Sequence, residues 1–134
     1  MNRKLNFTAI LIFIFSGLFA QHPGGVVKAN LNGLQFVFDS QSGSILSMSY
    51  PATGVMLQTT RDSAGLVDLA FPVKEFEPLR LASRFSKNAR ITKSKGMVTI
   101  HWAELGASRT FARFEGKVSA TVVFKEDPDG KSVS

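Results

Sequence analysis

The sequence predicts an all-β protein: an antiparallel β-sandwich of the supersandwich-like kind, preceded by an N-terminal signal peptide. Glycines recur about every 8–12 residues through much of the chain after residue 20, where they mark turns. Between these turns, apolar and polar residues alternate, as they do in strands that bury one face. No segment sustains the period of an amphipathic helix. These patterns together favour an antiparallel sandwich.

Residues 1–20 have the layout of a secretory signal peptide. Arg3 lies in a basic start, and a mostly apolar run over 5–20 ends in small residues just before Pro23. Sixteen helical residues reach about 24 Å, short of the roughly 30 Å hydrocarbon core, so an uncleaved anchor is the weaker alternative. We expect cleavage after Ala20, export to the periplasm or the cell exterior, and no membrane contact of the mature chain.

The remaining residues, 21–134, are expected to form the sandwich as one domain. Alternation is clearest in four segments, at 34–39, 46–50, 98–102 and 117–125. Each predicted strand has one apolar face that we expect to point into the core. The expected inner-face residues are Leu34, Phe36, Phe38, Leu46, Met48, Tyr50, Val98, Ile100, Trp102, Val118, Ala120, Val122 and Phe124, with Gln35 and Asp39 assigned to a polar face.

The segments between the strands carry turn-forming residues. Residues 39–43 predict a hairpin loop in which Gly43 takes a positive φ. Residues 51–54 and 93–96 predict the next turns, each closed by a glycine. The segment 79–85 fits a short helix and an edge strand equally well, because prolines interrupt the region before it.

The end of the sequence predicts a turn followed by a further strand. Asp127-Pro-Asp-Gly is a strong turn signal, and residues 131–134 resemble the start of a strand. A sheet left in mid-hairpin exposes an edge that natural folds usually cover. We therefore expect the sandwich to be incomplete and the chain to be an N-terminal fragment, with a complete small protein as the alternative.

Composition excludes several kinds of catalytic site. The chain has no cysteine, which rules out a disulfide scaffold, a Cys-ligated metal and a thiol nucleophile. His22 and His101 are the only histidines and lie far apart in sequence, so we expect no metal site. No Gly-x-Ser-x-Gly elbow is present, and the carboxylates of Glu75 and Glu77 are better explained as solvated loop charges. The sequence predicts no catalytic residue and no cofactor.

The chain is basic, with 16 Lys+Arg against 10 Asp+Glu. Five of the basic residues fall between 84 and 95, where no acidic residue interrupts them. Such a run suits an acidic glycan or a nucleic acid, but its three-residue spacing alternates between strand faces, which favours a solvated surface. Export argues against nucleic acid as a partner. Arg90 remains a candidate glycan contact.

The other candidate glycan contacts are Tyr50, His101 and Trp102. Tyr50 and Trp102 are the only Tyr and Trp of the chain, and sugar rings stack on such side chains. Both follow apolar residues on the same strand face, so a core role is the favoured alternative for each. His101 lies on the polar face of its strand and would be the only base if the chain were itself a sugar-modifying enzyme.

The run from Asn32 to Asp39, followed by Ser-Gly-Ser-Ile-Leu at 42–46, resembles the first hairpin of a known domain type. This is the N-terminal galactose mutarotase-like, or supersandwich, domain of large secreted bacterial glycoside hydrolases. The turn at 51–54 and the late strand at 117–125 are similar in kind. The resemblance implies a non-catalytic sandwich that packs against a downstream catalytic domain and helps to shape its substrate cleft. It does not support mutarotase activity, which needs a histidine pair and a glutamate base.

The expected function is therefore that of a scaffold with weak glycan contact in an exported polysaccharide-degrading enzyme. Its expected partners are a polysaccharide or oligosaccharide and the downstream catalytic domain of the same chain. The alternative is a complete small secreted structural or adhesion module that binds a partner through a sheet edge, or binds an acidic glycan.

Overall fold

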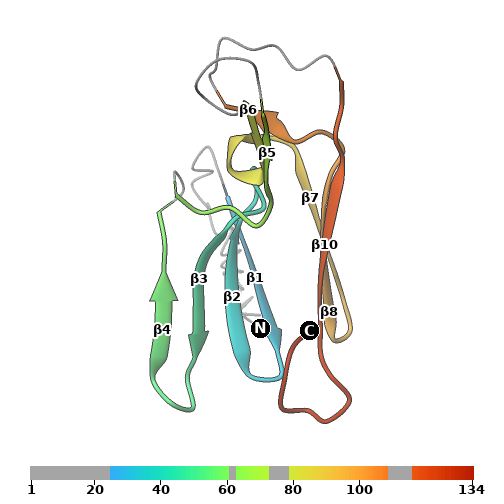
Figure 1. Ribbon diagram of the computed structural model, residues 1–134. Coiled ribbons are helices and arrows are strands. Elements are labelled where there is room, and N and C mark those ends of the chain that lie inside the picture. Colours follow the sequence, from blue (N-terminus) through green and yellow to red (C-terminus); the bar gives the residue numbers. More distant parts are fainter. Residues whose placement is uncertain (1–24, 61–62, 73–78, 109–115) are drawn as a thin grey trace, which may run out of the picture.

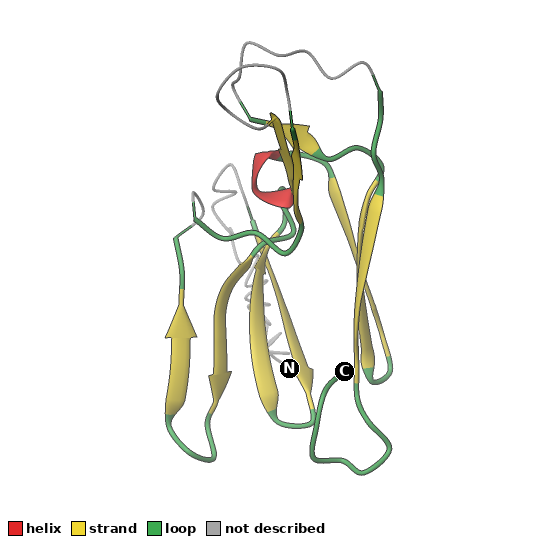
Figure 2. Cartoon of the chain, viewed as in Figure 1, coloured by secondary structure: helices red, strands yellow, loops and turns green. Residues whose placement is uncertain are grey.

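The computed structural model describes residues 25–60, 63–72, 79–108 and 116–134, and the predicted signal peptide at 1–20 lies outside these ranges. The described strands form three antiparallel sheets (Figures 1 and 2), which confirms the all-β prediction. The larger sheet has the order β1-β2-β3-β4, from strands β1 (Val26–Leu31), β2 (Leu34–Asp39), β3 (Ile45–Tyr50) and β4 (Val55–Gln58).

The other two sheets have three strands each. One has the order β10-β8-β7, from strands β7 (Ala89–Ser94), β8 (Met97–Trp102) and β10 (Ala120–Lys125). The third is small and lies at one end of the molecule (Figure 1). It has the order β5-β6-β9, from strands β5 (Asp68–Phe71), β6 (Leu79–Ala82) and β9 (Gly106–Ala107), and β6 continues into the 3₁₀ helix η1 (Ser83–Phe85).

The core lies between the β1–β4 sheet and the β7-β8-β10 sheet, and we call the facing sides of these sheets their inner faces. Phe36 and Phe38 stack with ring centroids 5.6 Å apart, and both rings contact Phe124 of the opposite sheet, at 5.3 and 5.8 Å. Ile100 and Trp102 of β8 have no exposed surface. The inner faces predicted for 34–39 and 98–102 are confirmed, because Phe36, Phe38, Val98, Ile100 and Trp102 are all buried in this core.

The loop between β2 and β3 closes over this core. Gly43 has a φ of 71°, as the turn prediction requires. The indole Nε1 of Trp102 donates a hydrogen bond of 2.7 Å to the carbonyl oxygen of Ser42. Asp39 was assigned to the polar face, but it is buried, because its Oδ1 accepts hydrogen bonds from the backbone N–H groups of Gln41 and Ser42 at 2.8 and 2.9 Å.

A β-bulge corrects the predicted inner face of β3. The register between β2 and β3 shifts after Val37, so Phe36 lies opposite Met48 but Phe38 lies opposite Ile45. As a result, Ile45 and Met48 pack against the core cluster, and Ile45 takes the place that strict alternation gave to Leu46.

Residues 79–85 combine the two structures that the sequence left open. Leu79–Ala82 form strand β6, and Ser83–Phe85 form the 3₁₀ helix directly after it. The strand is not at an edge, because it lies between β5 and β9. Leu79 and Leu81 are buried, which accounts for the apolar alternation in this segment.

Candidate functional site

The inner face of the β1–β4 sheet is apolar across all four strands, but its burial falls steeply toward β4. In one row, Leu31 pairs with Leu34 and Tyr50 pairs with Val55. The two pairs join in one row because Gln35 and Ser49, the next residues along β2 and β3, pair with each other. The exposed fraction rises from 2% at Leu31 to 39% at Tyr50 and 57% at Val55. The row is therefore apolar in composition throughout and covered only at its β1–β2 end.

The next row of the same face repeats this gradient. Ala29 pairs with Phe36, Phe36 with Met48, and Met48 with Leu57. Phe36 is 2% exposed, whereas Leu57 is 57% exposed. The outer face of β4 carries Met56 and Gln58, and each of them pairs there with a serine of β3. Pairing with β3 thus places Val55 and Leu57 of β4 on the inner face, where they continue the two apolar rows.

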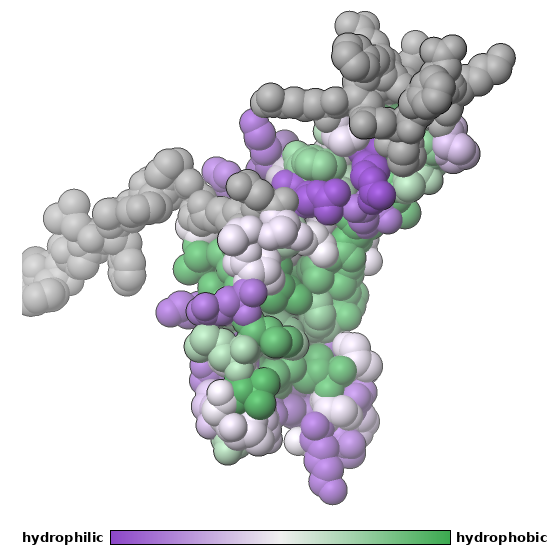
Figure 3. Space-filling model, turned by 60° about the vertical axis from the view of Figure 1, so that its left-hand side comes forward, coloured by the Kyte–Doolittle hydropathy of each residue, from purple (hydrophilic) through white to green (hydrophobic). Residues whose placement is uncertain are grey.

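The gradient arises because the opposing sheet has one strand fewer. β10 is the edge strand of the three-stranded sheet, and β4 lies farther from that sheet than β1, β2 or β3 (Figure 1). In the space-filling view toward the β4 side, hydrophobic side chains gather on the surface (Figure 3). A hollow of about 290 Å³ opens here, lined mainly by apolar groups from Ile45, Met48, Leu57, Ala64 and Leu66. Exposed apolar patches of this kind mark interaction surfaces.

The free edge of β10 borders the same surface. Among the described strands, β10 pairs only with β8. The N–H of Glu126 donates to Gly96 on the β8 side, so by alternation the backbone groups of Thr121 and Val123 point to the free edge, as do those of Lys125, which bond to Ser134. We use the term open side for the inner-face residues Tyr50, Val55 and Leu57 of β3 and β4 together with this β10 edge.

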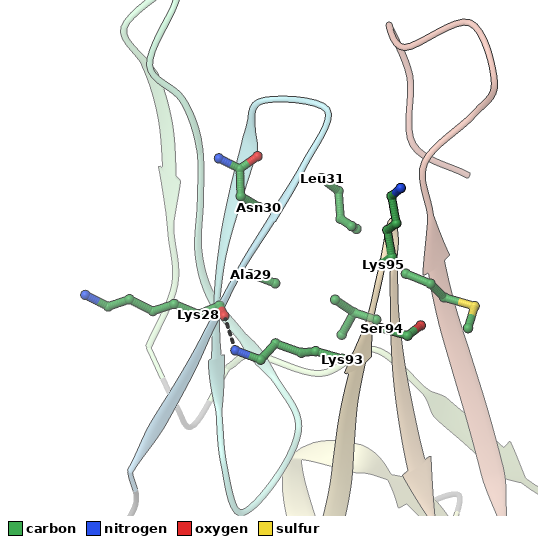
Figure 4. Close-up of a pocket in the computed structure, with 9 residues that line it drawn as sticks. Lys28, Ala29, Asn30, Leu31, Lys93, Ser94 and Lys95 are labelled. Atoms are coloured by element: carbon green, nitrogen blue, oxygen red, sulfur yellow. Dashed lines mark hydrogen bonds between the residues drawn. The ribbon is translucent and has the colours of Figure 1, made fainter.

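The opposite side of the sandwich, between the edges of β1 and β7, is built differently. A hollow of about 470 Å³ lies here, with Ala29 and Leu31 in its floor and Lys93 and Lys95 on the β7–β8 wall (Figure 4). Lys28 lines it through its backbone, and its side chain points away from the hollow (Figure 4). The Nζ of Lys93 crosses to β1 and donates a 3.1 Å hydrogen bond to the carbonyl oxygen of Lys28. Lysines at sheet edges are a common protection against pairing with other chains. This side is therefore guarded, whereas β4 carries no charged residue.

The structure brings two of the predicted glycan contacts together on the outer face of the β7-β8-β10 sheet. Arg90 pairs with His101 across β7 and β8, and His101 pairs with Thr121 across β8 and β10. The Nδ1 atom of His101 lies 3.0 Å from the hydroxyl of Thr121. All three residues are exposed. They form a row of hydrogen-bonding groups on a solvent-facing sheet, and we call it the polar row.

The two predicted aromatic contacts lie elsewhere. Trp102 is on the inner face of β8 with no exposed surface, so its ring offers nothing for a sugar to stack on and the core alternative applies. Tyr50 is on the other sheet, on the predicted apolar face, but is 39% exposed and belongs to the open side rather than to a closed core. The four candidates therefore do not form one site.

Sequence reasoning did not single out strand β4 of the open side. Its apolar run Val55-Met-Leu lacks alternation, and no strand was predicted there. The only signal available was the position of this run directly after the predicted turn at 51–54.

The described residues offer few groups for chemistry. Within them, no three His, Cys, Asp or Glu side chains lie close enough to hold a metal ion, and no helix is long and apolar enough to cross a membrane. The buried hydroxyl of Ser44 donates to the carbonyl oxygen of Ala64 at 2.9 Å and accepts from Ser42, which gives it a structural role. Glu75, Glu77 and His22 lie outside the described residues.

No protein-family model, curated protein or solved structure matches this chain.

Proposed function

We propose that this chain is a non-catalytic β-sandwich module of an exported polysaccharide-degrading glycoside hydrolase, in which it acts as a scaffold and contacts the glycan weakly. The open side is the observation that carries this proposal. A side that presents Tyr50, Val55 and Leu57 to solvent, next to a strand edge with free hydrogen-bonding groups, is suited to packing against another body. In the proposed enzyme, that body is the remainder of the polypeptide, including its catalytic domain.

The resemblance of the 32–46 region supports the enzyme class. Those residues form the turn after β1, strand β2, the loop that closes over Trp102, and the start of β3. They therefore include β2, an inner strand of the four-stranded sheet, whose Phe36 and Phe38 belong to the core.

The polar row supports a weak contact with glycan. Arg90, His101 and Thr121 offer donors and acceptors at the spacing of neighbouring strands, about 5 Å, on a flat face. A few exposed hydrogen bonds contribute about 0.5–1.5 kcal/mol each, so three of them correspond to dissociation constants in roughly the millimolar range or weaker. This suits a module that holds a polymer near a catalytic domain through many repeated contacts.

Electrophoresis of the exported chain through gels containing neutral or acidic polysaccharides tests the glycan part of the proposal. We expect slowed migration that Arg90→Ala and His101→Ala both abolish, while Lys117→Ala, which removes the same charge at a site away from the row, leaves it intact. Unchanged migration in every polysaccharide would contradict glycan contact. Polysaccharide cleavage that disappears in His101→Ala would contradict the non-catalytic role.

A second candidate function is that of a secreted module that binds an acidic glycan. The observation that favours it is the hollow between β1 and β7, where Lys93 and Lys95 on the β7–β8 wall offer cationic groups to a chain of carboxylates or sulfates (Figure 4). In the same gels, this function predicts slowing only by acidic polysaccharides, weakened by salt and by Lys93→Ala. Arg90→Ala would then have no specific effect.

A further inference from the structure

We infer that the open side receives one additional antiparallel strand beside β10, formed by the residues that directly follow Ser134 in the parent polypeptide. This inference rests on the proposed function, in which the chain is one module of a longer protein. It names the first element of that protein that the module contacts, and the register in which the contact is made.

The hairpin that would carry this strand has already begun. The backbone N–H of Lys125 donates to the carbonyl oxygen of Ser134 at 2.8 Å, and the N–H of Ser134 donates back to Lys125 at 2.9 Å. Glu126 and Val133 form a bridge inside this pair. This reciprocal pattern is the repeating unit of an antiparallel ladder, and it lies on the free edge of β10.

The turn of this hairpin is fastened to the β1–β4 sheet, which fixes its direction. The side-chain amide of Asn32 donates to the carbonyl oxygen of Ser132 at 2.7 Å, and the Asn32 backbone N–H donates to Oε1 of Glu126 at 2.8 Å. Within the turn, Ser132 donates to Asp127 at 2.7 Å. A chain leaving Ser134 therefore starts in line with β10, on its open edge.

The Lys125–Ser134 pair determines which side chains of the added strand point inward. Phe124 and Val122 are inner-face residues of β10, and they would lie opposite the first and third residues after Ser134. The second and fourth residues would lie opposite Val123 and Thr121, exchange backbone hydrogen bonds with them, and face solvent. Apolar side chains are thus required at the first, third and fifth positions, because a slip of one residue turns every side chain to the other face.

A strand in this place would cover the part of the inner face that is now exposed. It would lie about 4.8 Å from β10 in the sheet direction, which extends the smaller sheet toward the surface of β3 and β4. Tyr50, Val55 and Leu57 would then face apolar side chains across the sandwich, as Phe36 and Phe38 already face Phe124.

A second copy of the chain fits this space less well than a single strand does. Two β10 edges paired about a two-fold axis would make one continuous sheet. The β3–β4 portion of each copy extends past its own β10, so both portions would need the same volume beneath that sheet. A single strand completes the opposing sheet without this clash.

The test fuses six residues after Ser134 of the full chain. One version alternates valine and threonine beginning with valine, and the other has the same composition beginning with threonine. We expect the first to raise the melting midpoint, followed by Trp102 fluorescence, by about 5 °C and to abolish binding of a dye that reports exposed apolar surface. The second version should change neither quantity.

Two substitutions on β4 show where the added strand lies. Leu57→Ser should remove the gain in melting midpoint in the first fusion, whereas Met56→Ser should leave it unchanged. The two side chains are matched in exposure, at 57% and 59%, but Met56 pairs with Ser49 on the outer face. In the chain without the fusion, neither substitution should shift the midpoint by more than about 2 °C, because both side chains are exposed.

Three results would overturn the inference. Equal midpoints in the two fusions would show that register does not matter. If Met56→Ser removed the gain in melting midpoint and Leu57→Ser did not, the added strand would lie on the outer face of β4 and not on its inner face. A concentration-dependent dimer of the unfused chain that already protects the open side from the dye would identify a second copy as the occupant. Polysaccharide retardation by the polar row is measured separately, so the glycan proposal and the strand proposal can fail independently.

Discussion

Replacing Gly43 with alanine should lower the free energy of unfolding much more than the same change at Gly54. Both glycines have a φ of 71°, a backbone conformation that L side chains rarely adopt. A Cβ at position 43 would lie 2.7 Å from Cγ2 of Ile100 and 2.8 Å from Cζ2 of Trp102, whereas a Cβ at 54 would meet nothing within 4 Å. The pair therefore separates steric overlap from backbone strain.

The magnitude follows from these two contributions. Alanine in the left-handed region costs about 1–2 kcal/mol, and this cost applies to both variants. Overlap with rigid core side chains costs a further 1–3 kcal/mol, roughly, because a close-packed interior cannot yield without moving its neighbours. We expect Gly54→Ala to lose about 1–2 kcal/mol of unfolding free energy and Gly43→Ala about 2–5 kcal/mol.

Thermal unfolding measured by Trp102 fluorescence provides the assay. The indole is fully buried and is the only one in the chain, so its emission reports the core. At about 4 °C for each kcal/mol, Gly43→Ala should melt roughly 4–12 °C below Gly54→Ala. Equal melting midpoints would mean that the β2–β3 loop does not lie against Ile100 and Trp102, and the packing of the two sheets described above would be wrong.

Two further predictions concern charged groups at the surface. Asp68→Asn removes the 3.1 Å contacts from Oδ2 to Arg80 and Arg84, which are partly exposed, so chemical denaturation should show a loss of about 1 kcal/mol or less that shrinks at high salt. A hydrogen bond from the backbone of Lys131 lowers the pKa of Asp129, so this carboxylate supports the turn above its unfolded pKa and stops doing so as pH falls through its folded pKa. In an NMR titration, the amide of Lys131 should follow this transition at acidic pH, and Asp129→Asn should abolish it.

The sequence predicted the strands best where one face is buried and the other is wet. In β2 and β8, alternation alone selects Phe36, Phe38, Ile100 and Trp102 for the core, because a half-buried strand requires that pattern. Alternation did not predict Ile45 as an inner-face residue. The β-bulge shifts the register there, and the hydrophobic pattern of the sequence does not indicate a bulge.

Loop chemistry and short apolar runs were harder to interpret. Asp39 is polar and ends a strand, so alternation placed it outward, but its carboxylate caps the following loop from inside. Strand β4 has three apolar residues in a row, a pattern that suits a strand covered on both faces as well as it suits a short helical segment. Only its pairing with β3 shows which of its residues face inward.

The polar row and the open side differ in how far they could be predicted from the sequence. The pairing of Arg90 with His101 follows once the hairpin turn is placed at Lys95 and Gly96, so that part of the polar row was open to prediction from local turn geometry. The exposure of Tyr50 was not, because it depends on how many strands the opposing sheet has. The residue pattern of one strand does not indicate how many strands the opposing sheet has.

The difference between the two sides of the sandwich is the strongest reason to regard the open side as an interface rather than a defect. At the β1–β7 side, Lys93 reaches across the gap to the backbone of Lys28, and charge discourages any further strand. At the β4 side, Val55 and Leu57 lie in solvent on the face that their pairing with β3 turns toward the opposing sheet. A sandwich that works alone needs both sides guarded, since either edge can recruit another chain. Protection of one side only therefore supports the proposal that another part of a longer protein covers the other.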